Sequence, residues 1–107
     1  MKSNDRLEYL LQLLNEDKND DFVIYALAKE YEKLGQVEAS DRMFQQLLEI
    51  NQDYLATYYH YGKLCEQLGK IEEAKNLYTM GIQKAKLQND HHALSELNSA
   101  LENLLDT

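Results

Sequence analysis

The chain has 107 residues, with 19 acidic and 11 basic side chains and a formal net charge of −8. Its length suits one domain, and its negative charge argues against nucleic acid or an anionic membrane surface as the main partner. The absence of proline and the presence of only four glycines favour helix throughout, and a single cysteine excludes an internal disulfide framework and favours a cytoplasmic location.

Residues 5 to 16 are predicted to form the first helix. A leucine stripe at helical spacing makes it amphipathic: Leu7, Leu10, Leu11 and Leu14. Ser3, Asn4 or Asp5 is expected to cap its start. The apolar run is too short for a secretory signal or a membrane span.

Residues 21 to 53 are predicted to form a helical hairpin that begins at a cap residue, Asp20 or Asp21. Gly35 suits the left-handed conformation that follows a helix, so the first helix of the hairpin ends there. Ala28 and Ser40 fall where the two helices come closest, and small side chains at this point let the hairpin close.

Residues 55 to 88 repeat this pattern. A shift of 34 residues places Tyr25 on Tyr59 and Lys29 on Lys63, and it predicts that Gly62 faces Ala74. No stop signal interrupts the second helix of this copy until about residue 89. An internal period of this length is typical of stacked helical hairpins.

Residues 90 to 105 are predicted to form a last helix that caps the stack. Gln88-Asn89-Asp90 supplies a turn and a helix cap, and a stripe of leucines and alanines follows. If the helix keeps the register of the repeat, Leu94, Leu97 and Leu101 point toward the concave groove.

The period and the size pattern of the two hairpins resemble the tetratricopeptide repeat family. The residues that carry the resemblance are Ile24, Leu27-Ala28, Tyr31, Ser40 and Phe44 in the first copy and Tyr58, Tyr61-Gly62, Cys65, Ala74 and Tyr78 in the second. The chain departs from the family in lacking the proline that ends each repeat. The resemblance implies an all-α fold in which about six helices form an antiparallel hairpin stack, a right-handed superhelix, with residues 1–107 as a single domain.

No stretch of the sequence is typical of an enzyme. The chain has no phosphate-binding glycine loop, no nucleophile signature and no HExxH or CxxC motif. His91 and His92 are adjacent on a helix and point about 100° apart, so they chelate a metal poorly together with His60. Cys65 is expected to be a buried structural thiol. An acid–base pair of His60 and Glu66 is disfavoured because residues six apart on a helix share no face. We therefore expect no metal, no cofactor and no catalysis.

The resemblance also implies where a partner binds, because the first helices of tetratricopeptide repeats line the concave face. On that basis the predicted partner-binding residues are Tyr25, Lys29, Tyr59, His60 and Lys63. Tyrosine offers a large contact area with a polar tip, and lysine attracts a carboxylate. In the alternative interpretation the tyrosines only fill the groove and the lysines pair with Glu32 and Glu66.

The preferred hypothesis is a module for protein–protein interaction that binds a peptide segment or a partner helix. The alternative is a structural protein that self-associates through its terminal helices, so the chain is expected to be a monomer or a weak homo-oligomer. Some family members bind the carboxylate at a chaperone's C-terminus through a Lys, Asn, Asn, Lys, Arg set. The matching positions here hold Tyr25, Lys29, His60 and, if the last helix keeps register, Asp90 and Leu94. Only one cation is retained and Asp90 would repel a carboxylate, which disfavours chaperone tails as ligands.

Overall fold

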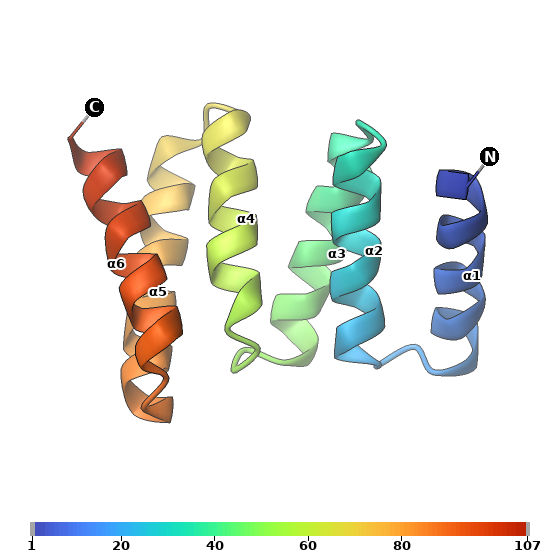
Figure 1. Cartoon of the computed structure of the whole chain (residues 1–107), viewed down its shortest axis with the longest axis horizontal. Helices are drawn as coiled ribbons and strands as arrows, with labels where there is room; N and C mark the ends of the chain where they lie inside the picture. Colours follow the sequence, from blue (N-terminus) through green and yellow to red (C-terminus); the bar gives the residue numbers. More distant parts are fainter. Residues whose placement is uncertain (1, 107) are drawn as a thin grey trace. The chain divides into compact units, whose positions relative to one another are not determined.

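The computed structural model describes the backbone of residues 2 to 106 and the side chains of residues 5 to 106. The described residues form six α-helices (Figure 1): α1 Lys2–Glu16, α2 Asp21–Lys33, α3 Val37–Ile50, α4 Ala56–Gln67, α5 Ile71–Gln88 and α6 His91–Leu105. The prediction of an all-α fold built from about six packed helices is confirmed. The chain divides into two compact units, residues 1–52 with α1 to α3 and residues 53–107 with α4 to α6.

Most helix ends follow the local signals in the sequence. The carboxylate of Asp20 accepts a hydrogen bond from the backbone N–H of Val23 at 3.2 Å, and Asp90 caps α6 in the same way through Ala93 at 3.0 Å. Gly35 has a φ of 77°, as expected for the left-handed residue after α2. The roles of Gly35 and Asp90 were predicted, and Asp20 is one of the two caps predicted for α2.

The start of α1 differs from the prediction. The helix begins at Lys2, so Ser3, Asn4 and Asp5 lie within it and do not cap it; the side chains of residues 3 and 4 lie outside the described part. The prediction failed because these polar residues resemble an N-cap sequence, while one more turn of helix adds backbone hydrogen bonds.

In the first unit, α2 packs against both α1 and α3. The hydroxyl of Ser40 on α3 donates a hydrogen bond to the backbone carbonyl of Ala28 on α2 at 2.7 Å, and both residues are fully buried. The close approach predicted between the two helices is confirmed. The core between α1 and α2 is formed by Leu10, Val23, Ala26 and Leu27.

In the second unit, two glycines make room for large aromatic side chains. A Cβ atom on Gly62 would lie 2.3 Å from the ring of Tyr78, and one on Gly81 would lie 2.6 Å from Cβ of Tyr58. The atoms nearest to a Cβ on Gly62 therefore belong to Tyr78, and Ala74, which the repeat predicts opposite Gly62, is also fully buried. The repeat alignment identified the tight site but not the side chain that fills it. Cys65 is fully buried in this unit, as predicted.

The repeat register would point Leu97 into the groove, but the structure buries this residue against α5. Leu97 is almost completely buried, and its Cδ1 would lie 3.0 Å from a Cβ on Gly81 of α5. Leu97 thus packs against α5, where the contact buries apolar area, and polar residues of α6 line a groove with α4.

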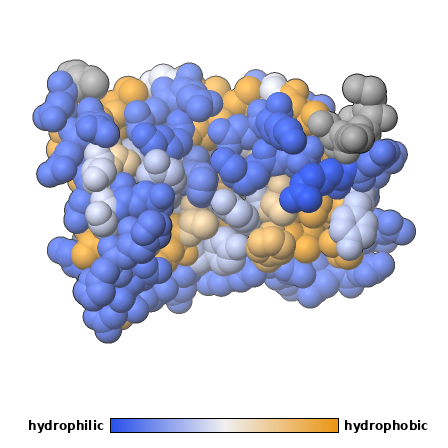
Figure 2. Space-filling model, in the orientation of Figure 1, coloured by the Kyte–Doolittle hydropathy of each residue, from blue (hydrophilic) through white to orange (hydrophobic). Residues whose placement is uncertain are grey.

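The face shown in Figure 2 is mainly hydrophilic, with hydrophobic residues scattered over it. In the part of the chain that the structure describes, no helix combines the length and apolar character needed to cross a membrane.

Candidate functional site

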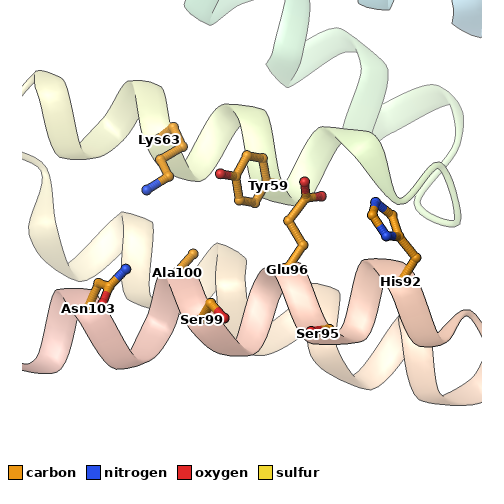
Figure 3. A pocket seen from close by; sticks show the side chains of 8 residues that line it. All are labelled: Tyr59, Lys63, His92, Ser95, Glu96, Ser99, Ala100 and Asn103. Atoms are coloured by element: carbon orange, nitrogen blue, oxygen red, sulfur yellow. The ribbon is translucent and has the colours of Figure 1, made fainter.

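A groove with a volume of about 350 Å³ lies between α4 and α6 in the second unit (Figure 3). Its lining consists of two residues of α4 and six of α6: Tyr59, Lys63, His92, Ser95, Glu96, Ser99, Ala100 and Asn103. Polar and charged groups therefore predominate in its walls.

The α4 wall contains two of the predicted binding residues. Tyr59 and Lys63 are four positions apart, so they lie on one face of the helix. The Lys63 ammonium lies 5.6 Å from the centre of the Tyr59 ring, a distance at which a cation and an aromatic face attract each other. The Lys63 side chain is 39% exposed, so its charge remains accessible to a ligand.

The position of Lys63 is also set by a second contact. Its ammonium lies 3.9 Å from the Glu66 carboxylate, and that carboxylate accepts a hydrogen bond from the hydroxyl of Tyr78. Burial raises the pKa of Tyr78, and the bond to Glu66 raises it further. Tyr78 thus keeps its proton at neutral pH and holds Glu66 beside Lys63.

The α6 wall was missed by the sequence reasoning. Its lining residues, from His92 to Asn103, recur every three or four positions along the helix, so they occupy one face of it. Small side chains at Ser95, Ser99 and Ala100 leave space, while the Glu96 side chain extends toward Tyr59 (Figure 3). The available signal was the polar face of α6 opposite its leucine stripe, but α6 has no counterpart in the repeat from which to take its register.

The other predicted residues lie outside this groove's lining. The His60 ring packs edge-on against the Tyr59 ring, with the centres 5.2 Å apart. Tyr25 and Lys29 lie on α2 in the first unit, where the Lys29 ammonium is 3.3 Å from the Glu32 carboxylate. Lys29 and Lys63 thus lie beside Glu32 and Glu66, as expected if the lysines only pair with these glutamates. Such exposed pairs contribute only about 0–1 kcal/mol, so they do not prevent either lysine from binding a ligand.

A smaller groove of about 220 Å³ lies in the first unit. It is formed by Leu11, Leu14 and Asn15 of α1, by Lys18 in the turn that follows, and by Gln46 of α3. Among the described residues, no three His, Cys, Asp or Glu side chains gather closely enough to bind a metal ion. The α4–α6 groove offers a cation, an anion, an aromatic ring and several hydrogen-bonding groups, a set suited to binding a polar chain.

The family profile described as "Tetratricopeptide repeat" matches residues 23–54 and 55–80. Among solved structures, a crystal structure of a tetratricopeptide repeat domain protein from Salinibacter ruber is 37% identical in sequence. The match covers 81% of this chain and 97% of that one, with a TM-score of 0.78. A comparison with curated proteins gave no match.

Two more distant structures share the fold and contain bound peptides. PcrH, in complex with the chaperone binding region of PopD, has a TM-score of 0.89 at 17% identity and covers 98% of this chain and 80% of its own. The first TPR of Spaghetti (RPAP3), bound to the HSP90 peptide SRMEEVD, has a TM-score of 0.78 at 20% identity and covers 99% and 82%.

Proposed function

This chain belongs to the tetratricopeptide repeat family, and from that premise we propose that it is a protein-binding module that receives an extended peptide segment of a partner protein. The observation that carries the proposal is the α4–α6 groove, with Tyr59 and Lys63 in one wall. The peptides bound by PcrH and by the first TPR of Spaghetti support this class of ligand.

The dimensions of the groove suit an extended chain. The lining residues of α6 run from His92 to Asn103, about 16 Å at 1.5 Å per helical residue. An extended peptide advances about 3.3 Å per residue, so about five residues fit along this wall. The Tyr59 ring supplies contact area at low entropic cost, and Lys63 supplies a charge.

The remaining predicted residues have supporting roles in this proposal. His60 packs against Tyr59 and limits the positions that the ring can adopt. Tyr25 and Lys29 are related to Tyr59 and Lys63 by the 34-residue repeat, so α2 presents the same pair of side chains for a further contact. Residues 1–107 act as a single domain in this proposal, and none of its residues has a catalytic role.

Self-association through the terminal leucine stripes is less well supported. Leu10, Leu97 and Leu104 are each at least nine-tenths buried within the chain, whereas Leu11 and Leu105 are 41% and 58% exposed. Single exposed leucines of this kind are normal on the surface of a monomer. We expect a monomer in sedimentation velocity at tens of micromolar, and a stable dimer at that concentration would favour the alternative.

Panning of a phage-displayed random dodecapeptide library on the immobilised chain tests the proposal. Enriched peptides are then titrated by fluorescence polarisation against the wild type and against Tyr59→Ala plus Lys63→Ala. We expect binding to weaken at least tenfold, because the double variant loses the aromatic surface and the charge of the α4 wall.

A matched control removes one tyrosine and one lysine elsewhere. Tyr9 and Lys75 are exposed on α1 and α5, and Tyr9→Ala plus Lys75→Ala should leave binding unchanged. Failure to enrich any peptide, or equal affinity for the wild type and the Tyr59/Lys63 double variant, would refute the proposal.

A further inference from the structure

We infer that the α4–α6 groove selects a peptide segment that carries charges of both signs, with an acidic side chain beside Lys63 and a basic side chain beside Glu96. The inference rests on the proposed function, since it specifies the ligand of the same groove. It goes further by assigning a ligand role to Glu96, a residue of α6 that lies outside the repeated segments.

The charges of the groove are separated along its length. In Figure 3 the Lys63 ammonium lies toward the end that contains Asn103, while Glu96 lies nearer the end that contains His92. No ion pair within the described residues joins Lys63 to Glu96. The Lys63 ammonium instead pairs with the Glu66 carboxylate at the long distance of 3.9 Å. The groove therefore presents a positive and a negative group at separate positions.

The distance along the groove between Glu96 and the end near Lys63, which Asn103 marks, sets the spacing of the two charged residues in the ligand. Glu96 and Asn103 are about two helical turns apart, or about 10 Å. At about 3.3 Å per residue in an extended chain, the acidic and basic side chains of the ligand lie about three residues apart. Asn103 offers an amide that donates to the acidic group at the Lys63 end.

The net charge of the protein argues against a purely acidic ligand. A formal charge of −8 repels an acidic peptide at long range, and Lys63 alone does not reverse that field. A basic side chain in the same segment is attracted by the overall field and pairs with Glu96. The long-range field and the local lysine thus favour the same mixed-charge segment.

Fluorescein-labelled nine-residue peptide pools test this inference. The five pools differ at positions 3 and 6. Two mixed pools have Asp and Arg or Arg and Asp, two single-sign pools have Asp and Asp or Arg and Arg, and a neutral pool has Asn and Gln. The other positions are an equal mixture of Ala, Leu, Tyr and Ser. Both mixed orders are included because a peptide can run along the groove in either direction. We expect the better mixed pool to bind at least fivefold more tightly than either single-sign pool.

Two variants assign each charge to its partner. Lys63→Met should remove the advantage of the peptide Asp, so that the mixed pool binds no better than the Arg and Arg pool. Glu96→Gln should remove the advantage of the peptide Arg in the same way. Lys75→Met and Glu73→Gln, which change exposed charges on α5, should leave the ranking of the pools unaltered.

The outcomes distinguish this inference from the proposed function. Equal binding of all pools that is still lost in the Tyr59/Lys63 double alanine variant would overturn the charge selection and leave peptide binding intact. Tightest binding by a single-sign pool, or a mixed-pool preference that survives Glu96→Gln, would also overturn it. Absence of binding by every pool overturns the inference, while the panning experiment separately decides the function.

Discussion

Gly81→Ala is expected to destabilise the second unit although alanine is the better helix former. The new Cβ would lie 2.6 Å from Cβ of Tyr58 and 3.0 Å from Cδ1 of Leu97, well inside the ~3.5–4.0 Å at which carbon atoms pack favourably. Because Cβ of Tyr58 is bonded directly to the backbone, no rotamer change moves it away, so α4 and α5 must separate.

The expected magnitude follows from two opposing effects. Overpacking a core costs about 1–3 kcal/mol, whereas replacing glycine by alanine within a helix gains about 1 kcal/mol. The contact with a Cβ atom favours the upper part of the first range, so we expect a net loss of about 1–2 kcal/mol. For a chain of this size that lowers Tm by about 4–10 °C.

Thermal unfolding followed by circular dichroism at 222 nm measures this change. Thr79→Ala is the matched control, because Thr79 is an exposed residue of the same helix, and it should shift Tm by no more than about 2 °C. A Gly81→Ala protein as stable as the wild type, or more stable, would refute the close packing of α4 against α5.

Three other substitutions probe other contacts. Arg6→Ala should lower the free energy of unfolding in urea by about 1–2 kcal/mol, because Arg6 pairs at 3.2 Å with the buried carboxylate of Glu30 and an unpaired buried charge is unfavourable. Adding Glu30→Met removes that buried charge and should recover most of the loss. A double variant as unstable as Arg6→Ala would contradict this explanation. The pKa of Tyr78 is raised in the folded protein, so its contribution to the free energy of unfolding is fully present below the pKa near 10 of the unfolded chain and falls by up to ~1.4 kcal/mol per pH unit above it. Tyr78→Phe should therefore reduce the loss of stability at alkaline pH. Urea unfolding at several pH values measures this difference. Asp90→Ala should cost about 1 kcal/mol through loss of the α6 cap, and an unchanged urea midpoint would argue against that cap.

The sequence predicts features that depend on local chemistry. Gly35 adopts the left-handed conformation because a residue without Cβ does so without strain, and Asp90 caps α6 because its carboxylate accepts a nearby backbone N–H. The repeat adds the contact of Ala28 with Ser40, since small residues recur at the same place in both copies. These features require no knowledge of the rest of the fold.

Features that depend on how helices rotate against one another were not predictable in this way. The sequence identifies Gly62 as a tight site, but which side chain fills the space depends on the rotation of α5, which brings Tyr78 there. The register of α6 likewise had no template, so the burial of Leu97 and the place of Glu96 in the groove wall are seen only in the structure. The binding assignments of Tyr25, Lys29, Tyr59, His60 and Lys63 stay predictions.

Chemical-shift mapping tests directly whether a peptide binds in the α4–α6 groove. A peptide enriched by panning is titrated into ¹⁵N-labelled protein, and amide shifts are followed by heteronuclear correlation spectra. If the peptide binds in the α4–α6 groove, the largest changes fall on Tyr59 and Lys63 of α4 and on Ser95 to Asn103 of α6. Changes centred on the exposed face of α5, with the α4–α6 groove unaffected at saturation, would contradict it.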